Sequence, residues 1–152
     1  MPLIILTGFP SSGKSTAAQK LEKFFKEKEK TVHVVSEELL LGGLHKNEIF
    51  ADSKHEKDVR GRIKSEVVRL LNKDNVVICD GLNYIKGFRY ELYCASKSVK
   101  TTQVTVQCDL SDADVSDLNV TRPDNLQYSD QILKEKQHLP RYQNLRVKKI
   151  II

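Results

Sequence analysis

The chain has 152 residues, of which 39% are hydrophobic and 30% are charged. A chain of this length buries roughly two-thirds of its unfolded surface, which supports one domain with its own core and excludes two. Its composition excludes an intrinsically disordered chain, and no apolar run reaches the ~18 residues that a membrane span requires. The first residues lack the basic segment of a signal peptide.

The cysteines and the net charge restrict the environment and the partners. Cys79, Cys94 and Cys108 are an odd number and form no Cys-x-x-Cys pair, which favours free thiols in a reducing compartment over a disulfide framework or a zinc site. The net charge of +5 favours an anionic partner without identifying it.

Short apolar runs rich in β-branched residues alternate along the chain with segments of helical period. The expected strands are Leu3–Thr7, Val32–Val35, Val76–Cys79, Gln103–Cys108 and Val147–Ile152. The expected helical faces are Ala17, Leu21, Phe24 and Phe25, then Val59, Ile63, Val67, Leu70 and Leu71, and then a shorter helix over Gly87–Ser98. This alternation predicts an α/β fold of three layers, with a five-stranded parallel sheet and helices on both faces.

Two segments between these elements are expected to be loops. Gly42–Ser53 follows the second strand and Asp109–Gln127 follows the fourth, so both should lie beyond the carboxyl ends of the strands, where such sheets bind ligands. A helix rich in Lys and Glu is predicted near Tyr128–Gln137, closing a lid region of about residues 109–140.

A phosphate-binding loop is the strongest motif in the sequence. It follows the first strand, opens a helix and matches G-x-x-x-x-G-K-[ST]. The residues predicted to bind ATP are Gly8, Phe9, Pro10, Ser11, Ser12, Gly13, Lys14, Ser15 and Thr16. The glycines let successive backbone N–H groups face an anion at a helix N-terminus. Lys14 supplies a charge to the β and γ phosphates, and Ser15 offers a hydroxyl to Mg²⁺.

Two acidic segments end neighbouring strands. Asp80 closes the run Val76–Cys79, which predicts the second metal anchor of a phosphate-binding-loop protein, although such a residue can also simply cap a turn. Ser36, Glu37 and Glu38 end the second strand, where Glu37 could position water, hold Mg²⁺ or act as a base toward a hydroxyl. The structural alternative is the first turn of a helix, where Ser followed by Glu is ordinary capping.

From Asp80 to Cys94 the sequence DGLNYIKGFRYELYC resembles the killer-toxin-insensitive twelve family, the P-loop ATPases associated with the Elongator complex. Asp52 to Lys57, with Arg60 and Gly61, fits the helix that follows the second strand in that family. The family is similar to the kinase that phosphorylates seryl-tRNA in selenocysteine synthesis.

The resemblance implies a nucleotide-kinase-like fold with a mobile lid and an ATPase stimulated by tRNA. It also implies support of Elongator in wobble-uridine modification, in the cytoplasm and also in the nucleus. The family usually has Asp where Glu37 stands. Asn119, Arg122 and Tyr128 resemble lid residues, which makes Arg122 the candidate lid arginine that reaches the γ-phosphate. Residues 1–152 are expected to be a single ATPase domain, without the helical tRNA-binding domain that family members usually carry.

Two basic groups are candidate contacts to RNA. Lys57, Arg60 and Lys64 form one stripe on the predicted helix, with ordinary ion pairs as the alternative interpretation. Lys86 and Arg89 follow Asp80 among aromatic residues, a combination that suits RNA phosphates and stacked bases.

The sequence thus predicts a Mg²⁺-dependent ATPase linked to tRNA and to Elongator, with Lys14, Glu37 and Arg122 as catalytic residues and Ser15, Asp80 and Glu37 at the metal. One alternative is a small kinase that phosphorylates an RNA or nucleoside hydroxyl, with Glu37 as base. Another is a nucleotide-gated adaptor whose hydrolysis is incidental. No exposed apolar stripe is evident, so we expect a monomer.

Overall fold

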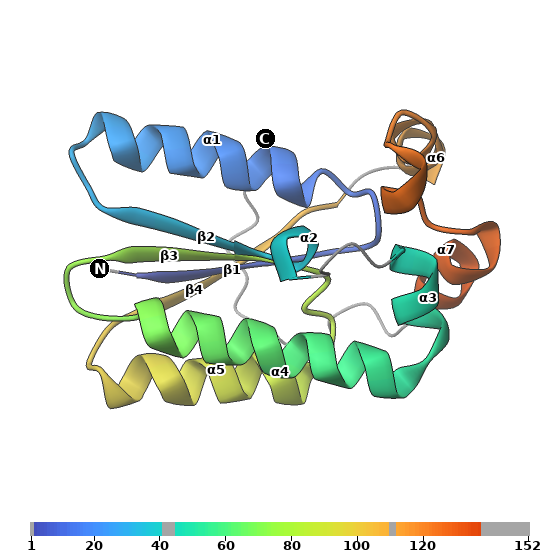
Figure 1. Ribbon diagram of the computed structural model, residues 1–152. Coiled ribbons are helices and arrows are strands. Elements are labelled where there is room, and N and C mark those ends of the chain that lie inside the picture. The colour runs from blue at the N-terminus through green and yellow to red at the C-terminus, as the bar shows by residue number, and fades with distance from the viewer. Residues whose placement is uncertain (1, 41–44, 110–111, 138–152) are drawn as a thin grey trace.

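The computed structural model describes residues 2–40, 45–109 and 112–137 (Figure 1). Four parallel strands form one sheet in the order β2-β3-β1-β4, where β1 is Leu3–Thr7, β2 is Val32–Ser36, β3 is Val76–Asp80 and β4 is Gln103–Gln107. The sequence predicts these strands to within one residue. The fifth predicted strand, Val147–Ile152, lies outside the described residues.

Helices cover both faces of the sheet and complete the predicted three layers (Figure 1). Helix α1 (Lys14–Glu27) packs on one face, and α4 (Ser53–Leu70) and α5 (Lys86–Ser98) pack on the other. The side chains of β1 alternate between the two faces, since Leu3 and Ile5 join the α4/α5 core whereas Ile4 and Leu6 join the α1 core. Both faces of the central strands are therefore buried, as a parallel sheet requires.

The helical periodicity in the sequence explains this packing. Val59, Ile63 and Val67 recur every four residues on α4 and are all buried against the sheet. Asp52 caps the same helix, because its carboxylate accepts a hydrogen bond from the Lys54 N–H at 2.9 Å. On α1, Ala17 is buried as predicted, whereas the ring of Phe24 is about half exposed.

The two segments predicted to be loops contain helices. Between β2 and α4 lie α2 (Glu37–Leu40) and α3 (Lys46–Ala51). After β4 come α6 (Asp112–Val120) and a 3-10 turn over Asp124–Leu126. They are followed by α7 (Asp130–Gln137), which confirms the helix predicted near Tyr128–Gln137. These helices lie beyond the carboxyl ends of the strands (Figure 1). Residues 112–137, which include α6 and α7 but not α2 and α3, are called the lid region below. No helix in the described ranges is long and apolar enough to cross a membrane.

Candidate phosphate-binding site

The site forms where three parallel strands end at the same level. In the sheet register Asp80 lies beside Leu6 of β1 on one side and beside Ser36 of β2 on the other. The residues that follow these strand ends therefore converge. One pocket at this edge is lined by Ser11, Lys14, Ser15, Ser36, Glu37, Glu38, Lys46, Asp80, Gly81, Arg122 and Tyr128.

The loop between β1 and α1 requires glycine at its first position. Gly8 has φ 149°, and a Cβ there would lie 2.2 Å from the carbonyl oxygen of Cys108, so no side chain fits. Gly13 ends the loop in the left-handed region, with φ 80°, just before α1 begins. Ser11, with φ 58°, is buried inside the loop. This backbone curls around the N-terminus of α1, which is the geometry that binds phosphate.

The ammonium of Lys14 lies inside this loop. Its Nζ donates to the carbonyl oxygens of Gly8, at 3.3 Å, and of Phe9, and to the hydroxyl of Ser12 at 3.4 Å. Burial lowers the pKa of Lys14 to about 8, and the nearby carboxylates of Glu37 and Asp80 partly oppose this shift. Lys14 is therefore a desolvated cation at the phosphate loop. Thr16 is exposed on α1.

Asp80 and Ser15 lie together, as the two predicted metal anchors should. Burial raises the pKa of the Asp80 carboxyl, while a hydrogen bond from the Ser15 hydroxyl and the charge of Lys14 act against this rise. A hydroxyl beside a carboxylate is an oxygen donor pair that fits Mg²⁺. Across the described part of the chain, no three His, Cys, Asp or Glu side chains gather into a metal site. The residues that would hold Mg²⁺ here are Ser15 and Asp80.

Glu37 is held tightly at the first position of α2. Its Oε1 accepts a hydrogen bond from the Leu82 N–H at 2.7 Å, and its side chain is buried. Burial raises the pKa of Glu37, opposed by the Leu82 hydrogen bond and by the charges of Lys46 and Lys14. Gly81 makes this position possible, because a Cβ there would lie 2.7 Å from Glu37 Oε1. The carboxyl group of Glu37 thus reaches the pocket from the start of α2 and lies against Gly81, which has no side chain to block it.

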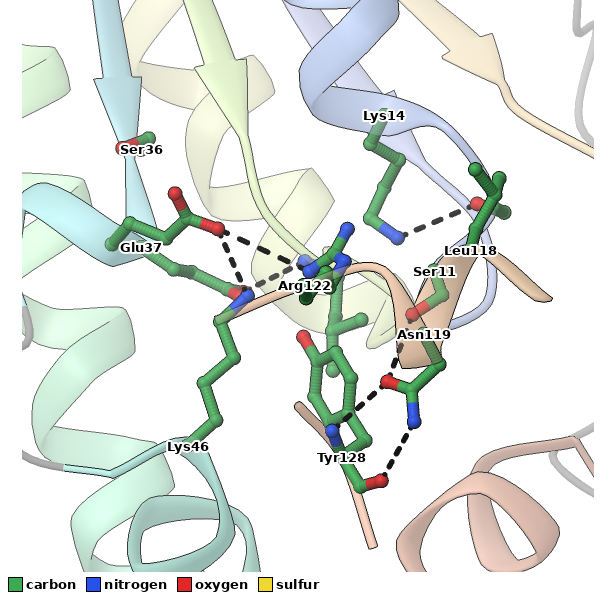
Figure 2. A network of polar contacts seen from close by, with 12 residues as sticks. Ser11, Lys14, Ser36, Glu37, Lys46, Leu118, Asn119, Arg122 and Tyr128 are labelled. Atoms are coloured by element: carbon green, nitrogen blue, oxygen red, sulfur yellow. Dashed lines mark hydrogen bonds and ion pairs between the residues drawn. The ribbon is translucent and has the colours of Figure 1, made fainter. Parts of the chain in front are cut away.

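The lid region is joined to the phosphate loop through Asn119 (Figure 2). Asn119 Oδ1 accepts from the Ser11 hydroxyl at 3.2 Å and from the Tyr128 N–H at 3.0 Å. Asn119 Nδ2 donates to the Tyr128 carbonyl oxygen at 2.9 Å. The buried amide therefore fixes Tyr128 over the pocket, and its position depends on the loop conformation at Ser11.

Lys46, at the start of α3, is a pocket residue that the sequence analysis missed. Its side chain is 4% exposed, and its Nζ lies 3.2 Å from Glu38 Oε1 and 4.9 Å from the centre of the Tyr128 ring. Arg122, predicted as the lid arginine, lines the same pocket, with Nη1 4.0 Å from the same Glu38 oxygen. Lys46 belongs to no recognisable sequence motif. It also lies in a segment that was expected to be a loop, where no residue was predicted to face the site.

Four of the five RNA candidates fall into two groups. Lys57 and Lys86 are exposed, whereas Arg60 forms an ion pair with Glu56 at 3.0 Å and Lys64 one with Glu91 at 2.6 Å.

Arg89 does not fit the prediction, because its side chain is buried. Its Nη1 donates to the carbonyl oxygens of Asn83, at 2.8 Å, and Tyr84, at 2.7 Å. It secures the loop between β3 and α5 and does not present its charge to an RNA.

Comparison with known proteins agrees with this geometry. The sequence profile of the family described as "Chromatin associated protein KTI12" matches residues 1–149. The chain belongs to the KTI12 family. It is 45% identical to the KTI12 homologue of Xenopus laevis over 132 residues, which are 87% of this chain and 47% of that protein. It is 35% identical to the Arabidopsis thaliana homologue over 139 residues, which are 89% of this chain and 45% of that protein. The chain thus spans about half the length of these KTI12 relatives.

Solved structures place the chain among P-loop NTPases with a kinase-like α/β fold. The structure of Chaetomium thermophilum Kti12 in complex with ADP-AlF3 matches with a TM-score of 0.75 at 31% identity, over 90% of this chain and 78% of that one. The structure of Mycobacterium tuberculosis APS kinase CysC with AMPPNP and APS matches with a TM-score of 0.64 at 18% identity, over 79% of this chain and 69% of that one. The second likeness concerns the fold alone.

Proposed function

We propose that this KTI12 family member binds and hydrolyses ATP in a Mg²⁺-dependent reaction at the pocket beyond β1, β2 and β3. The observation that carries the proposal is the convergence of Lys14, Asp80 and Glu37, from three separate segments, in one pocket beside the phosphate loop. The Chaetomium relative is in complex with ADP-AlF3, which supports nucleotide binding by this chain.

The phosphate loop would bind the triphosphate through its backbone N–H groups. Lys14, now donating to carbonyl oxygens of its own loop, would donate to the β and γ phosphate oxygens instead. Ser15 and, through water, Asp80 would hold Mg²⁺, which would supply neutralising charge to the phosphates. The carboxyl of Asp80 faces this position because it ends β3 beside the Ser15 hydroxyl.

Glu37 would orient the water that attacks the γ-phosphorus. Burial raises the pKa of its carboxyl, which makes the carboxylate a better proton acceptor. The Leu82 N–H fixes one of its oxygens and leaves the other for the water. Arg122 would stabilise the charge that develops on the transferred phosphoryl group, since it lines the same pocket from the lid region.

The same arrangement could also transfer the γ-phosphoryl group to an acceptor other than water. If a substrate hydroxyl takes the place of water beside Glu37, the protein is a small kinase of an RNA or nucleoside. A third possibility is a nucleotide-gated adaptor with incidental turnover. The proposed ATPase differs from the kinase in its product, because it releases inorganic phosphate into solution with ADP. It differs from the adaptor because its function depends on turnover and not on nucleotide binding alone.

The biological setting is proposed from the family. We propose that the cycle is linked to tRNA and assists Elongator in wobble-uridine modification, in the cytoplasm and the nucleus. The family's description as chromatin associated supports a nuclear location. The exposed Lys57 and Lys86, together with the net charge of +5, support an RNA contact on the α4/α5 side. We expect the protein to act as a monomer.

The test is steady-state turnover of γ-labelled ATP with Mg²⁺, with and without bulk tRNA. Label recovered as free phosphate, at a rate that tRNA raises, supports the proposal. Label recovered on RNA would replace it with the kinase. ATP binding without turnover would replace it with the adaptor.

A further inference from the structure

The pocket contains more cations than a phosphate loop alone provides. Lys14 belongs to the loop, whereas Lys46 and Arg122 come from α3 and the lid region and face the same space (Figure 2). Both of these outer cations lie near one oxygen, Glu38 Oε1, at 3.2 Å from Lys46 Nζ and 4.0 Å from Arg122 Nη1. The Glu38 carboxylate thus lies beside both outer cations.

Lys46 is held in place from several sides. Its ammonium lies 4.9 Å from the centre of the Tyr128 ring, and the Arg122 guanidinium lies 6.0 Å from the same ring. The next residue, Asn47, accepts a hydrogen bond from the Ser129 N–H at 2.8 Å, which ties the start of α3 to the lid region. Tyr128 in turn depends on Asn119 and so on the phosphate loop. The Lys46 ammonium is therefore fixed relative to Lys14.

The two partners of the Lys46–Glu38 ion pair differ in burial. The Lys46 side chain is 4% exposed, whereas the Glu38 side chain is 38% exposed. A buried ammonium is costly unless it is paired, so Lys46 needs an anion at this position. Glu38 can turn into solvent at little cost, but Lys46 remains in the pocket. An ammonium also has three donors, of which Glu38 takes one.

We propose that Lys46 binds the terminal phosphate of a nucleoside triphosphate, which displaces Glu38 from Lys46 and Arg122. This inference rests on the proposed nucleotide binding and adds a phosphate-binding residue and a competing carboxylate. The phosphate loop holds the triphosphate from one side of the pocket, and Lys46 faces the loop from the other side. A nucleoside diphosphate lacks the group that Lys46 contacts. Lys46 therefore confers preference for the triphosphate.

The test compares the binding of AMPPNP and ADP, each with Mg²⁺, by isothermal titration calorimetry. Lys46→Met keeps most of the side-chain volume over Tyr128 and removes the charge, and Lys46→Arg keeps the charge. Glu38→Gln removes the competing carboxylate. Lys20→Met, on the exposed side of α1, is the matched control for loss of a lysine.

AMPPNP affinity should change in opposite directions when Lys46 and when Glu38 is substituted. Lys46→Met weakens AMPPNP binding by about tenfold to one hundredfold, the range of a charge-assisted hydrogen bond, with ADP affinity within about threefold of wild type. Lys46→Arg keeps the preference. Glu38→Gln strengthens AMPPNP binding by about twofold to fivefold, as expected when a partly exposed ion pair no longer competes.

If the Lys46–Glu38 ion pair is only structural, the expected pattern is different, because Lys46→Met and Glu38→Gln would then both break that ion pair. Equal losses for AMPPNP and ADP in Lys46→Met, or weaker AMPPNP binding in both Lys46→Met and Glu38→Gln, would overturn the inference and leave the proposed function standing. Failure of the wild-type protein and of Lys20→Met to bind either nucleotide would overturn both.

Discussion

Substitution of Gly81 by alanine tests whether Glu37 is positioned for chemistry. A Cβ at Gly81 would lie 2.7 Å from Glu37 Oε1, 3.1 Å from its Cδ and 3.2 Å from its Cγ. Ordinary van der Waals contact begins at 3.4 Å, so the carboxylate has to move by 3.4 − 2.7, or about 0.7 Å. The same oxygen accepts from the Leu82 N–H at 2.7 Å, and that hydrogen bond has to lengthen.

The magnitude follows from this displacement. A weakened hydrogen bond to a buried carboxylate, together with local crowding, destabilises the fold by about 1–3 kcal/mol. Misplacement of a catalytic group by this distance lowers kcat by about tenfold to one hundredfold. The phosphate loop is not altered, so the effect should fall on kcat and leave KM for ATP within about threefold.

The assay is steady-state ATP hydrolysis by Gly81→Ala beside the control Gly87→Ala. A Cβ at Gly87 meets nothing within 4 Å. Gly87 lies in α5, where alanine favours the helix by about 1 kcal/mol. Gly87→Ala should therefore keep the wild-type kcat. A wild-type kcat in Gly81→Ala would refute the assignment of Glu37, because the carboxylate cannot keep its place beside a methyl group.

Three further predictions concern Lys14, Asn119 and Lys86. Because the pKa of Lys14 is about 8 and phosphate binds its protonated form, ATP affinity should fall by about tenfold between pH 7 and pH 9, whereas Lys14→Arg should flatten this profile in a binding titration. Asn119→Ala leaves the buried Tyr128 N–H without its acceptor and should lower the free energy of unfolding by about 2–3 kcal/mol in urea, with a raised KM for ATP; an unchanged urea midpoint would be inconsistent with the hydrogen bonds described. Lys86→Glu should weaken stimulation of hydrolysis by tRNA about threefold to tenfold at low salt and less at high salt, and stimulation equal to wild type would place the RNA contact elsewhere.

The sequence was sufficient for the parts of the site that follow one another along the chain. The phosphate loop, from Gly8 to Ser15, could be predicted because its glycines and its place between a strand and a helix depend on local geometry. Asp80 could be placed because buried parallel strands end at a common edge. The periodicity of α4 was also a reliable signal, since Val59, Ile63 and Val67 face one core.

The sequence was insufficient where the fold brings distant segments together. The proposed role of Lys46 depends on contact between α3 and Tyr128, some eighty residues later, and helix α3 has too few residues to show a helical period. Helix α6 was missed because its apolar residues do not gather on one face. The burial of Arg89 did have a signal: it shares a helical face with Leu92 and Ser96, at i, i+3 and i+7, and both are buried. The predicted RNA contact rested on the charge of Arg89 and on the aromatic residues around it, and this spacing was not used.

The most direct test of the account is the rate at which inorganic phosphate is released from Mg²⁺-ATP by the wild-type chain and by Lys14→Ala. The account predicts catalytic turnover by the wild type and a loss of at least about one hundredfold in kcat/KM in Lys14→Ala, because Lys14 is the charged residue of the loop Gly8 to Ser15. Equal rates for the two proteins would contradict it and would place any hydrolysis outside this pocket.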